Sequence, residues 1–229
     1  MTNDGVYISF YQTIENTTYF WRYDRKENIC ILICKKKFAD PFYYANHGMT
    51  CPEDPELMFF AHEGDTTYIT NRLWTGRLNG EMKNIAPQKL DENGILQDCF
   101  GHEMWAPSGK GLYFVKYPCS PGAEQGICYV DTEEKNVRVL YSDYRYWHVS
   151  VTEDERYLIA DTQSGRGDSE VIVIDQKTGE QRCVARAKIT WVHPCHPHPQ
   201  MNPNHTVVCF TGLNESGKTS AAFVDLSEK

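Results

Sequence analysis

The chain consists almost throughout of short segments in which apolar and polar residues alternate, a pattern typical of β-strands buried on one face. These segments are rich in β-branched and aromatic residues, and turns with Asn, Gly and Asp separate them. We find no convincing amphipathic helical pattern. The expected strands span 6–10, 18–23, 29–34, 57–61, 72–78, 111–116, 127–130, 137–141, 156–160, 171–174, 182–185, 206–210 and 221–224. The pattern predicts an all-β protein.

The strand pattern also repeats. Segment 104–114 has the same order of strand, tight polar turn and strand as segments 149–159 and 199–210, and segment 49–59 matches it more loosely. His102, His148 and His196 stand just before the three clear repeats and lie 46 and 48 residues apart. A period near 45 residues with about four strands per unit is the signature of propeller blades. We therefore predict a β-propeller of four-stranded antiparallel blades, about five in this chain.

The two ends of the repeat pattern do not match each other. The first expected strand, 6–10, corresponds to a second blade strand, whereas the last one, 221–224, corresponds to a third. Pairing of the N-terminal strand into the last blade would close five blades and remove exposed edges. Alternatively, the N-terminal side is incomplete and further blades, or self-association with another chain, complete the ring. We predict a single β-propeller domain over 1–229, with these alternatives left open.

The overall charge and the cysteines limit the classes of function. A net charge of −8 argues against a nucleic-acid partner, and an acidic substrate would need a local site made by a metal or arginine. The nine cysteines form no CxxC pair, the first residues lack the features of a signal peptide, and no run of 18 apolar residues occurs. We expect a soluble, cytoplasmic protein with reduced thiols and no membrane partner.

The segment 191–200 contains three of the eight histidines, interleaved with prolines. Because proline favours extended backbone before it, no helix can pass through this segment. In an extended chain His196 and His198 point the same way, and with His193 they offer nitrogen ligands for a divalent metal. Cys195 could add a ligand or a nucleophile, or be a small apolar residue. The alternative is a solvated loop whose histidines are incidental.

The histidines occupy corresponding positions in the repeat. His102, His148 and the pair His196 and His198 begin or precede the first strand of a blade. The first strands of a propeller line its central channel, so these side chains should converge on one metal or catalytic centre. For any one of them alone, the alternative is a core or rim histidine that is hydrogen-bonded to a backbone carbonyl.

Residues Gly212–Thr219 match the phosphate-binding pattern G-x-x-x-x-G-K-[ST]. Phosphate binding by this motif needs a helix that begins at Lys218 and Thr219, but the residues that follow have the pattern of a strand. We therefore interpret the segment as a hairpin loop, in which Lys218 and Thr219 have no functional role.

Several motifs, in order from about residue 45 to the C-terminus, resemble those of one family. They are His62-Glu-Gly, Asn71-Arg72-Leu-Trp74, Gly101-His102-Glu-Met-Trp105, Trp147-His148-Val-Ser, Ala160-Asp161-Thr and His196-Pro-His198-Pro. The chain resembles the oligogalacturonate lyases, which are seven-bladed β-propellers that bind manganese through histidines in the central channel. Members of that family are longer, and the difference would lie in N-terminal blades.

The resemblance implies a pectin-degrading, metal-dependent lyase that cleaves α-1,4-linked oligogalacturonides by β-elimination. The cofactor would be Mn²⁺ or another divalent first-row metal, and the partner a small acidic oligosaccharide. His102 matches the family's base, whereas His148, His196 and His198 match its metal ligands. His193 would be a fourth ligand, at a position where the family has glutamine. Arg72 would pair with a substrate carboxylate, with Arg77 as the alternative. His62 would contribute a contact in the channel wall.

Three other functions remain open from the sequence. One is a non-catalytic propeller scaffold of the TolB or WD type, and another is a truncated lyase without activity. A third is a metal-dependent hydrolase that uses the same imidazoles on a water molecule. Bound metal would argue against the scaffold, and a product with a C4–C5 double bond would argue against hydrolysis.

Overall fold

The computed structural model describes residues 1–122, 124–163, 167–190 and 195–227. Within these ranges the regular secondary structure is entirely β-strand, and the strands form five antiparallel sheets. No helix in these ranges is long and apolar enough to cross a membrane. The prediction of an all-β chain is therefore confirmed.

Three sheets have four strands each, and in all three the strands pair in chain order. The first contains β4 (Ala45–Thr50), β5 (Leu57–His62), β6 (Leu73–Arg77) and β7 (Met82–Asn84). The second contains β8 (Phe100–Trp105), β9 (Gly111–Lys116), β10 (Gly126–Asp131) and β11 (Val137–Tyr141). The third contains β12 (Tyr146–Val151), β13 (Tyr157–Thr162), β14 (Asp168–Asp175) and β15 (Gln181–Lys188).

The first and last sheets have three strands each in the described residues. One contains β1 (Tyr7–Ile14), β2 (Thr17–Asp24) and β3 (Ile29–Lys36), and the other β16 (Gln200–Met201), β17 (Val207–Leu213) and β18 (Thr219–Asp225). The predicted strand 221–224 is thus the third strand of its sheet. The assignment of residues 1–229 to a single domain stays a prediction.

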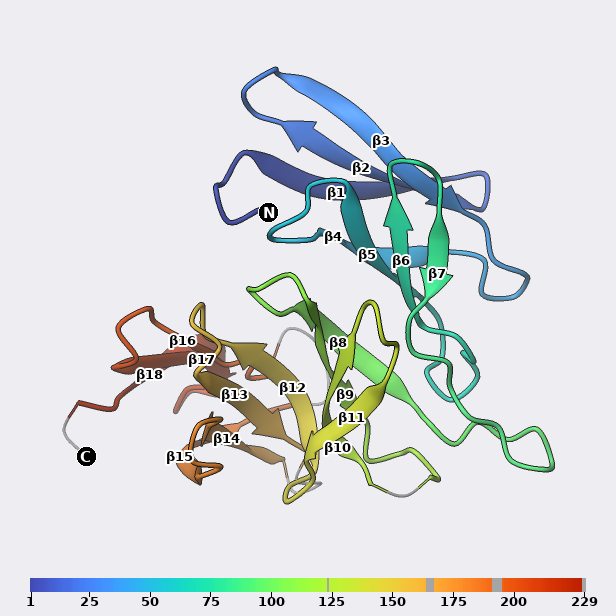
Figure 1. Ribbon diagram of the computed structural model, residues 1–229. Helices are drawn as coiled ribbons and strands as arrows, with labels where there is room; N and C mark the ends of the chain where they lie inside the picture. The colour runs from blue at the N-terminus through green and yellow to red at the C-terminus, as the bar shows by residue number, and fades with distance from the viewer. Residues whose placement is uncertain (123, 164–166, 191–194, 228–229) are drawn as a thin grey trace.

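The five sheets follow one another as propeller blades. Figure 1 shows them in an arc, from β1–β3 at the top, through β4–β7 and β8–β11, to β12–β15 and β16–β18 at the lower left. The first strands of successive sheets contact one another, because β4 meets β8, β8 meets β12, and β12 meets β16. These strands therefore form the inner side of the arc.

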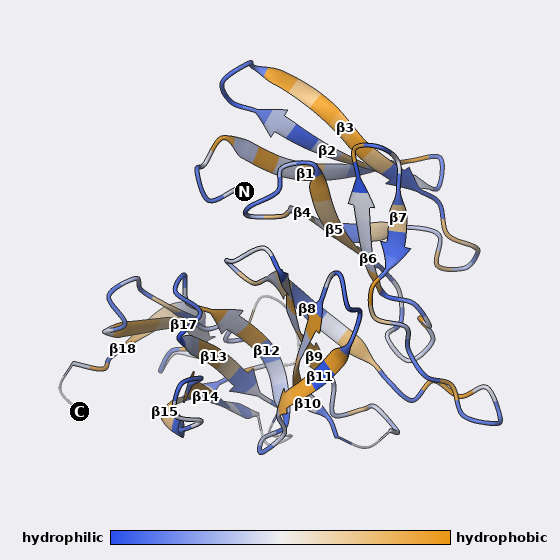
Figure 2. Cartoon of the chain, viewed as in Figure 1, coloured by the Kyte–Doolittle hydropathy of each residue, from blue (hydrophilic) through white to orange (hydrophobic). Residues whose placement is uncertain are grey.

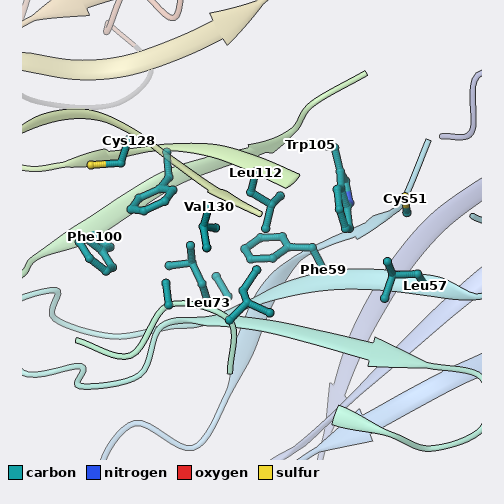
Figure 3. Packing of buried hydrophobic residues seen from close by; sticks show 13 residues of the cluster. Cys51, Leu57, Phe59, Leu73, Phe100, Trp105, Leu112, Cys128 and Val130 are labelled. Atoms are coloured by element: carbon teal, nitrogen blue, oxygen red, sulfur yellow. The ribbon is translucent and has the colours of Figure 1, made fainter. Parts of the chain in front are cut away.

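Apolar side chains fill the space between neighbouring sheets. Figure 2 shows that hydrophobic residues concentrate in the strands and hydrophilic ones in the turns. Between the sheets β4–β7 and β8–β11, Phe59, Leu73, Phe100, Leu112 and Val130 belong to one buried cluster (Figure 3). Full burial of such a side chain contributes about 1.5–3 kcal/mol. This packing holds the inner strands in place.

The inner strands are irregular where the site residues stand. The pairing register shifts between Asn46 and Met49 in β4, between Gly101 and Met104 in β8, and between Tyr146 and His148 in β12. Such bulges re-aim side chains and are common beside active sites. His47 and His102 each lie within one of these bulges and have positive φ angles of 52° and 59°.

The segment that matches the phosphate-binding pattern is a hairpin connection. It links β17 to β18, and Asn214 and Lys218 pair through the Asn214 N–H and the Lys218 carbonyl. Because a strand begins at Thr219, no helix N-terminus is present there to bind a phosphate. The predicted hairpin loop is confirmed.

Candidate active site

A cavity of about 660 Å³ lies at the inner side of the blades. Strands β1, β4, β8 and β12 and the segment before β16 contribute to its wall. The lining is polar and aromatic, and it comprises Tyr11, Asn46, His47, Gly48, Met49, Glu63, Thr66, Arg72, His102, Glu103, Tyr117, Trp147, His148, His196 and His198. Its volume suits a small-molecule ligand.

Three histidines from successive blades meet in this cavity. One ring nitrogen each from His102, His148 and His198 lies within 4.8 Å of the other two. The ring centroids of His148 and His198 are 3.8 Å apart, and that of His102 is 4.3 Å from His148 and 5.0 Å from His198. Three imidazoles so placed offer a nitrogen donor set for a divalent first-row metal.

Asp161 on β13 orients His148 and His198 through hydrogen bonds. It is fully buried and accepts a hydrogen bond of 2.7 Å from Nδ1 of His148. The backbone N–H groups of His148 and His198 also donate to it, over 2.8 and 3.1 Å. Burial raises the pKa of Asp161 to about 7, whereas the two N–H groups favour its ionised form. With Nδ1 held in this way, Nε2 of His148 is the nitrogen that offers a lone pair.

His102 owes its position to the bulge in β8 and to its small neighbour. A Cβ atom at Gly101 would overlap the ring of Tyr117, so glycine there lets the chain pass close to this ring. Burial and the nearby His148 and His198 lower the pKa of His102 to about 2. His102 is therefore neutral near pH 7, the form that can either ligate a metal or accept a proton.

His196 lies beside the cluster and packs against an aromatic ring. Its ring centroid is 4.1 Å from that of Trp147, 5.7 Å from that of His148 and 5.9 Å from that of His198. Cys195 is buried in the apolar cluster between the last two sheets, which matches the small apolar residue considered from the sequence. His193 lies outside the described residues.

A second group of charged residues forms another part of the cavity wall. The carboxylate of Glu103 accepts a 2.5 Å hydrogen bond from Nε of Arg72 and a 3.0 Å hydrogen bond from Nδ1 of His47. Nη2 of Arg72 also lies 3.3 Å from a carboxylate oxygen of Glu63. Burial alone would raise the pKa of Glu103, but Arg72 and His47 lower it below its usual range, so Glu103 is ionised.

The other two predicted substrate contacts, Arg77 and His62, are not among the residues that line the cavity. Arg77 is at the end of β6 and pairs with Asp54 over 2.7 Å. Nε2 of His62 lies 2.6 Å from the carbonyl of Phe42, and its ring stacks on Phe38. Arg72, by contrast, lines the cavity.

Sequence reasoning missed several residues of the cavity, above all His47 and Glu103. A signal for His47 was present, because segment 49–59 aligns with 104–114, and His47 precedes Met49 as His102 precedes Met104. Glu103 and Asp161 stood within quoted motifs, but nothing in their spacing indicated that they hold His47 and His148.

Comparison with known proteins gives structural matches alone. No protein-family model matches the chain, and a search of curated proteins found no match either. An oligogalacturonate lyase in complex with manganese matches with a TM-score of 0.77 and 24% identity, over 93% of this chain and 55% of that one. An oligogalacturonate lyase from Vibrio parahaemolyticus matches with a TM-score of 0.73 and 18% identity, over the same shares.

A protein of another kind shares the fold. TolB from Acinetobacter baumannii matches with a TM-score of 0.65 and 14% identity, over 98% of this chain and 50% of that one. The chain thus spans about half the length of each of these proteins. At such low identities the likeness shows the fold, so the predicted β-propeller is confirmed, and its structural neighbours include the family that the sequence motifs resemble.

Proposed function

We propose that this protein is a metal-dependent lyase that cleaves α-1,4-linked oligogalacturonides by β-elimination. The observation that carries the proposal is the meeting of His102, His148 and His198, from three successive blades, in a cavity that also contains Arg72. The fold likeness to oligogalacturonate lyases, one of them in complex with manganese, supports it.

The donor set fits a bound metal. One nitrogen of His148 lies within 4.8 Å of one of His198, and Asp161 fixes the orientation of His148. The ring centroid of His196 lies 5.7 and 5.9 Å from those of His148 and His198. We propose His148, His196 and His198 as ligands of Mn²⁺ or another divalent first-row metal, with His193 as the fourth. When bound, the metal would withdraw charge from the uronate carboxylate and so acidify the proton at C5.

We propose His102 as the base that takes the C5 proton. It lines the cavity beside His148 and His198, and its neutral ring has a lone pair for this purpose, although the lowered pKa makes it a weaker base than a free imidazole. A base cannot give the same lone pair to the metal, yet the position of His102 in the cluster would also suit a third ligand. Replacement by alanine separates the two roles, because loss of a base leaves the metal content unchanged and loss of a ligand lowers it.

Arg72 is the proposed contact for a substrate carboxylate. The described residues Glu103, Glu63 and His62 engage one N–H each at Nε, Nη2 and Nη1. A guanidinium has five N–H donors, so two remain for a bidentate or bridging contact. Because this contact exists both before and during the reaction, Arg72→Ala should raise KM as well as lower kcat.

The second candidate function is a non-catalytic binding scaffold, which the fold likeness to TolB favours. The two candidates differ in metal content, because a scaffold needs no stoichiometric metal. They also differ in the product formed from an oligogalacturonide.

The test is incubation of metal-free protein with digalacturonate, with and without added Mn²⁺. Ultraviolet absorbance of the conjugated C4–C5 double bond reports elimination, whereas galacturonate without such absorbance reports hydrolysis. We expect unsaturated product that depends on metal. Absence of product and of bound metal would support the scaffold instead.

A further inference from the structure

We propose that His47 is the proton donor that protonates the departing sugar oxygen in this lyase reaction. The inference rests on the proposed function, because it assigns one further step of the same elimination. His47 was not among the residues singled out from the sequence, and its position in the structure leads to the assignment.

The first observation is where the bulges place the two histidines. His47 in β4 and His102 in β8 occupy equivalent positions in neighbouring blades, both with positive φ, and both line the same cavity. The side chain of His47 is 41% exposed, so a ligand in the cavity can reach it.

The second observation is how His47 is held. Its Nδ1 binds one carboxylate oxygen of Glu103 at 3.0 Å, while Nε of Arg72 binds the other at 2.5 Å. The Glu103 side chain has no exposed surface, so its position and orientation are fixed. Because Glu103 occupies Nδ1, Nε2 is the nitrogen that faces a substrate and can give it a proton.

The reaction itself requires two groups. In a galacturonide, the hydrogen at C5 and the oxygen at C4 lie on opposite faces of the ring, so the base that takes the proton cannot also protonate the oxygen in the same step. The C5–H electron pair forms the C4–C5 double bond, the C4–O bond breaks, and its electron pair stays on the oxygen. His47 then gives its Nε2 proton to this oxygen and regains one from water, and the hydroxide so formed takes up the C5 proton that His102 holds.

A leaving-group experiment tests the proposal. The variant His47→Asn keeps an amide N–H near the position of Nδ1 and tolerates the positive φ, but it cannot transfer a proton. The matched control is His205→Asn, because His205 also has a positive φ (58°) and a carboxylate neighbour, Asp154 at 3.4 Å, but lies outside the cavity lining. The substrates are digalacturonate and a galacturonide with a 4-nitrophenyl group on O4, which departs as 4-nitrophenolate and needs no proton.

We expect kcat of His47→Asn to fall about 10²–10⁴-fold with digalacturonate and less than about tenfold with the nitrophenyl substrate. KM, metal content and thermal unfolding should stay near those of wild type, as should every parameter of His205→Asn. Equal losses with both substrates, or a change in KM alone, would overturn the assignment.

Tyr117 is the competing donor, because it also lines the cavity. If Tyr117→Phe shows the leaving-group dependence and His47→Asn does not, Tyr117 is the donor and His47 is not. If the wild type forms no unsaturated product at all, the proposed function fails together with this inference. An active wild type with an unaffected His47→Asn variant contradicts this inference alone.

Discussion

Strands β8 and β9 lie side by side in one sheet, yet they differ in burial and in the regularity of their pairing. All six residues of β9 are buried, and its pairing with β10 runs without interruption from Gly111 to Lys116. In β8 the register shifts at His102 and Glu103, and Glu103 is a buried charge. The second strand of the blade supplies apolar contacts, whereas the first strand interrupts its ladder to present functional groups.

The same difference recurs in the neighbouring blades. β4 is bulged beside the largely buried β5, and β12 is bulged beside β13. A non-glycine residue with positive φ typically costs ~1–3 kcal/mol, and His47 and His102 both have this conformation. The apolar clusters on the second strands offset this cost, so stability and function should respond to different residues.

The largest expected effect is on metal binding. Replacement of both His148 and His198 by alanine should abolish stoichiometric binding of Mn²⁺, because it removes two of the three clustered nitrogens. Metal content after dialysis, together with thermal unfolding, measures this. Full retention of metal would show that the inner strands do not carry the metal centre.

The next effect concerns stability and the second strands. Phe114 in β9 is fully buried and packs edge-to-face on Phe100, with ring centroids 4.8 Å apart. Phe114→Ala should lower the free energy of unfolding by about 3–5 kcal/mol, measured by urea denaturation. A comparable loss in His102→Ala, the matched change on the inner strand, would remove the distinction between the two strands.

The same distinction explains what could be predicted from the sequence. The ranges 111–116 and 137–141 coincide with β9 and β11, and the other expected strands each overlap an observed one, because regular burial leaves a clear apolar pattern. The inner strands β4, β8 and β12 were expected only as the first strands of the repeat segments 49–59, 104–114 and 149–159, and their bounds were not predicted. Their bulges, which contain polar residues such as Asn46, His47 and Glu103, interrupt the alternation of apolar and polar residues that marks a regular strand.

The histidines of the site could be found because their spacing follows the blade period, which places His102, His148 and His198 in one cluster. Their partners could not, because Asp161 bonds to His148 from the adjacent strand, and Glu103 bonds to His47 from the neighbouring blade. Such contacts depend on register and side-chain direction, which local patterns do not contain. The role of Arg72 remains a prediction, although its pairing with Glu103 places it in the cavity wall.

A smaller effect tests how a second strand supports an inner one. Asp161→Asn should weaken metal affinity by about 10–100-fold, because the amide holds His148 less firmly and turns an N–H toward a backbone donor. Competition with a chelator measures the affinity. An unchanged affinity would mean that β13 contributes packing but no support to the metal centre.

The smallest expected effect lies outside both kinds of strand. Lys218 stands in the exposed turn between β17 and β18, away from the cavity lining. Lys218→Ala should change neither stability nor turnover beyond about 0.5 kcal/mol. Nucleotide binding by the wild type that this variant loses would contradict the hairpin-loop interpretation.

The most direct test of the central claim joins metal binding to chemistry. Metal-free protein is titrated with Mn²⁺ in the presence of digalacturonate, and bound metal and unsaturated product are measured together. We predict that the rate of product formation rises with bound metal and levels off at one ion per chain. Stoichiometric binding of Mn²⁺ without any unsaturated product would contradict the assignment of the histidine cluster as the centre of a lyase.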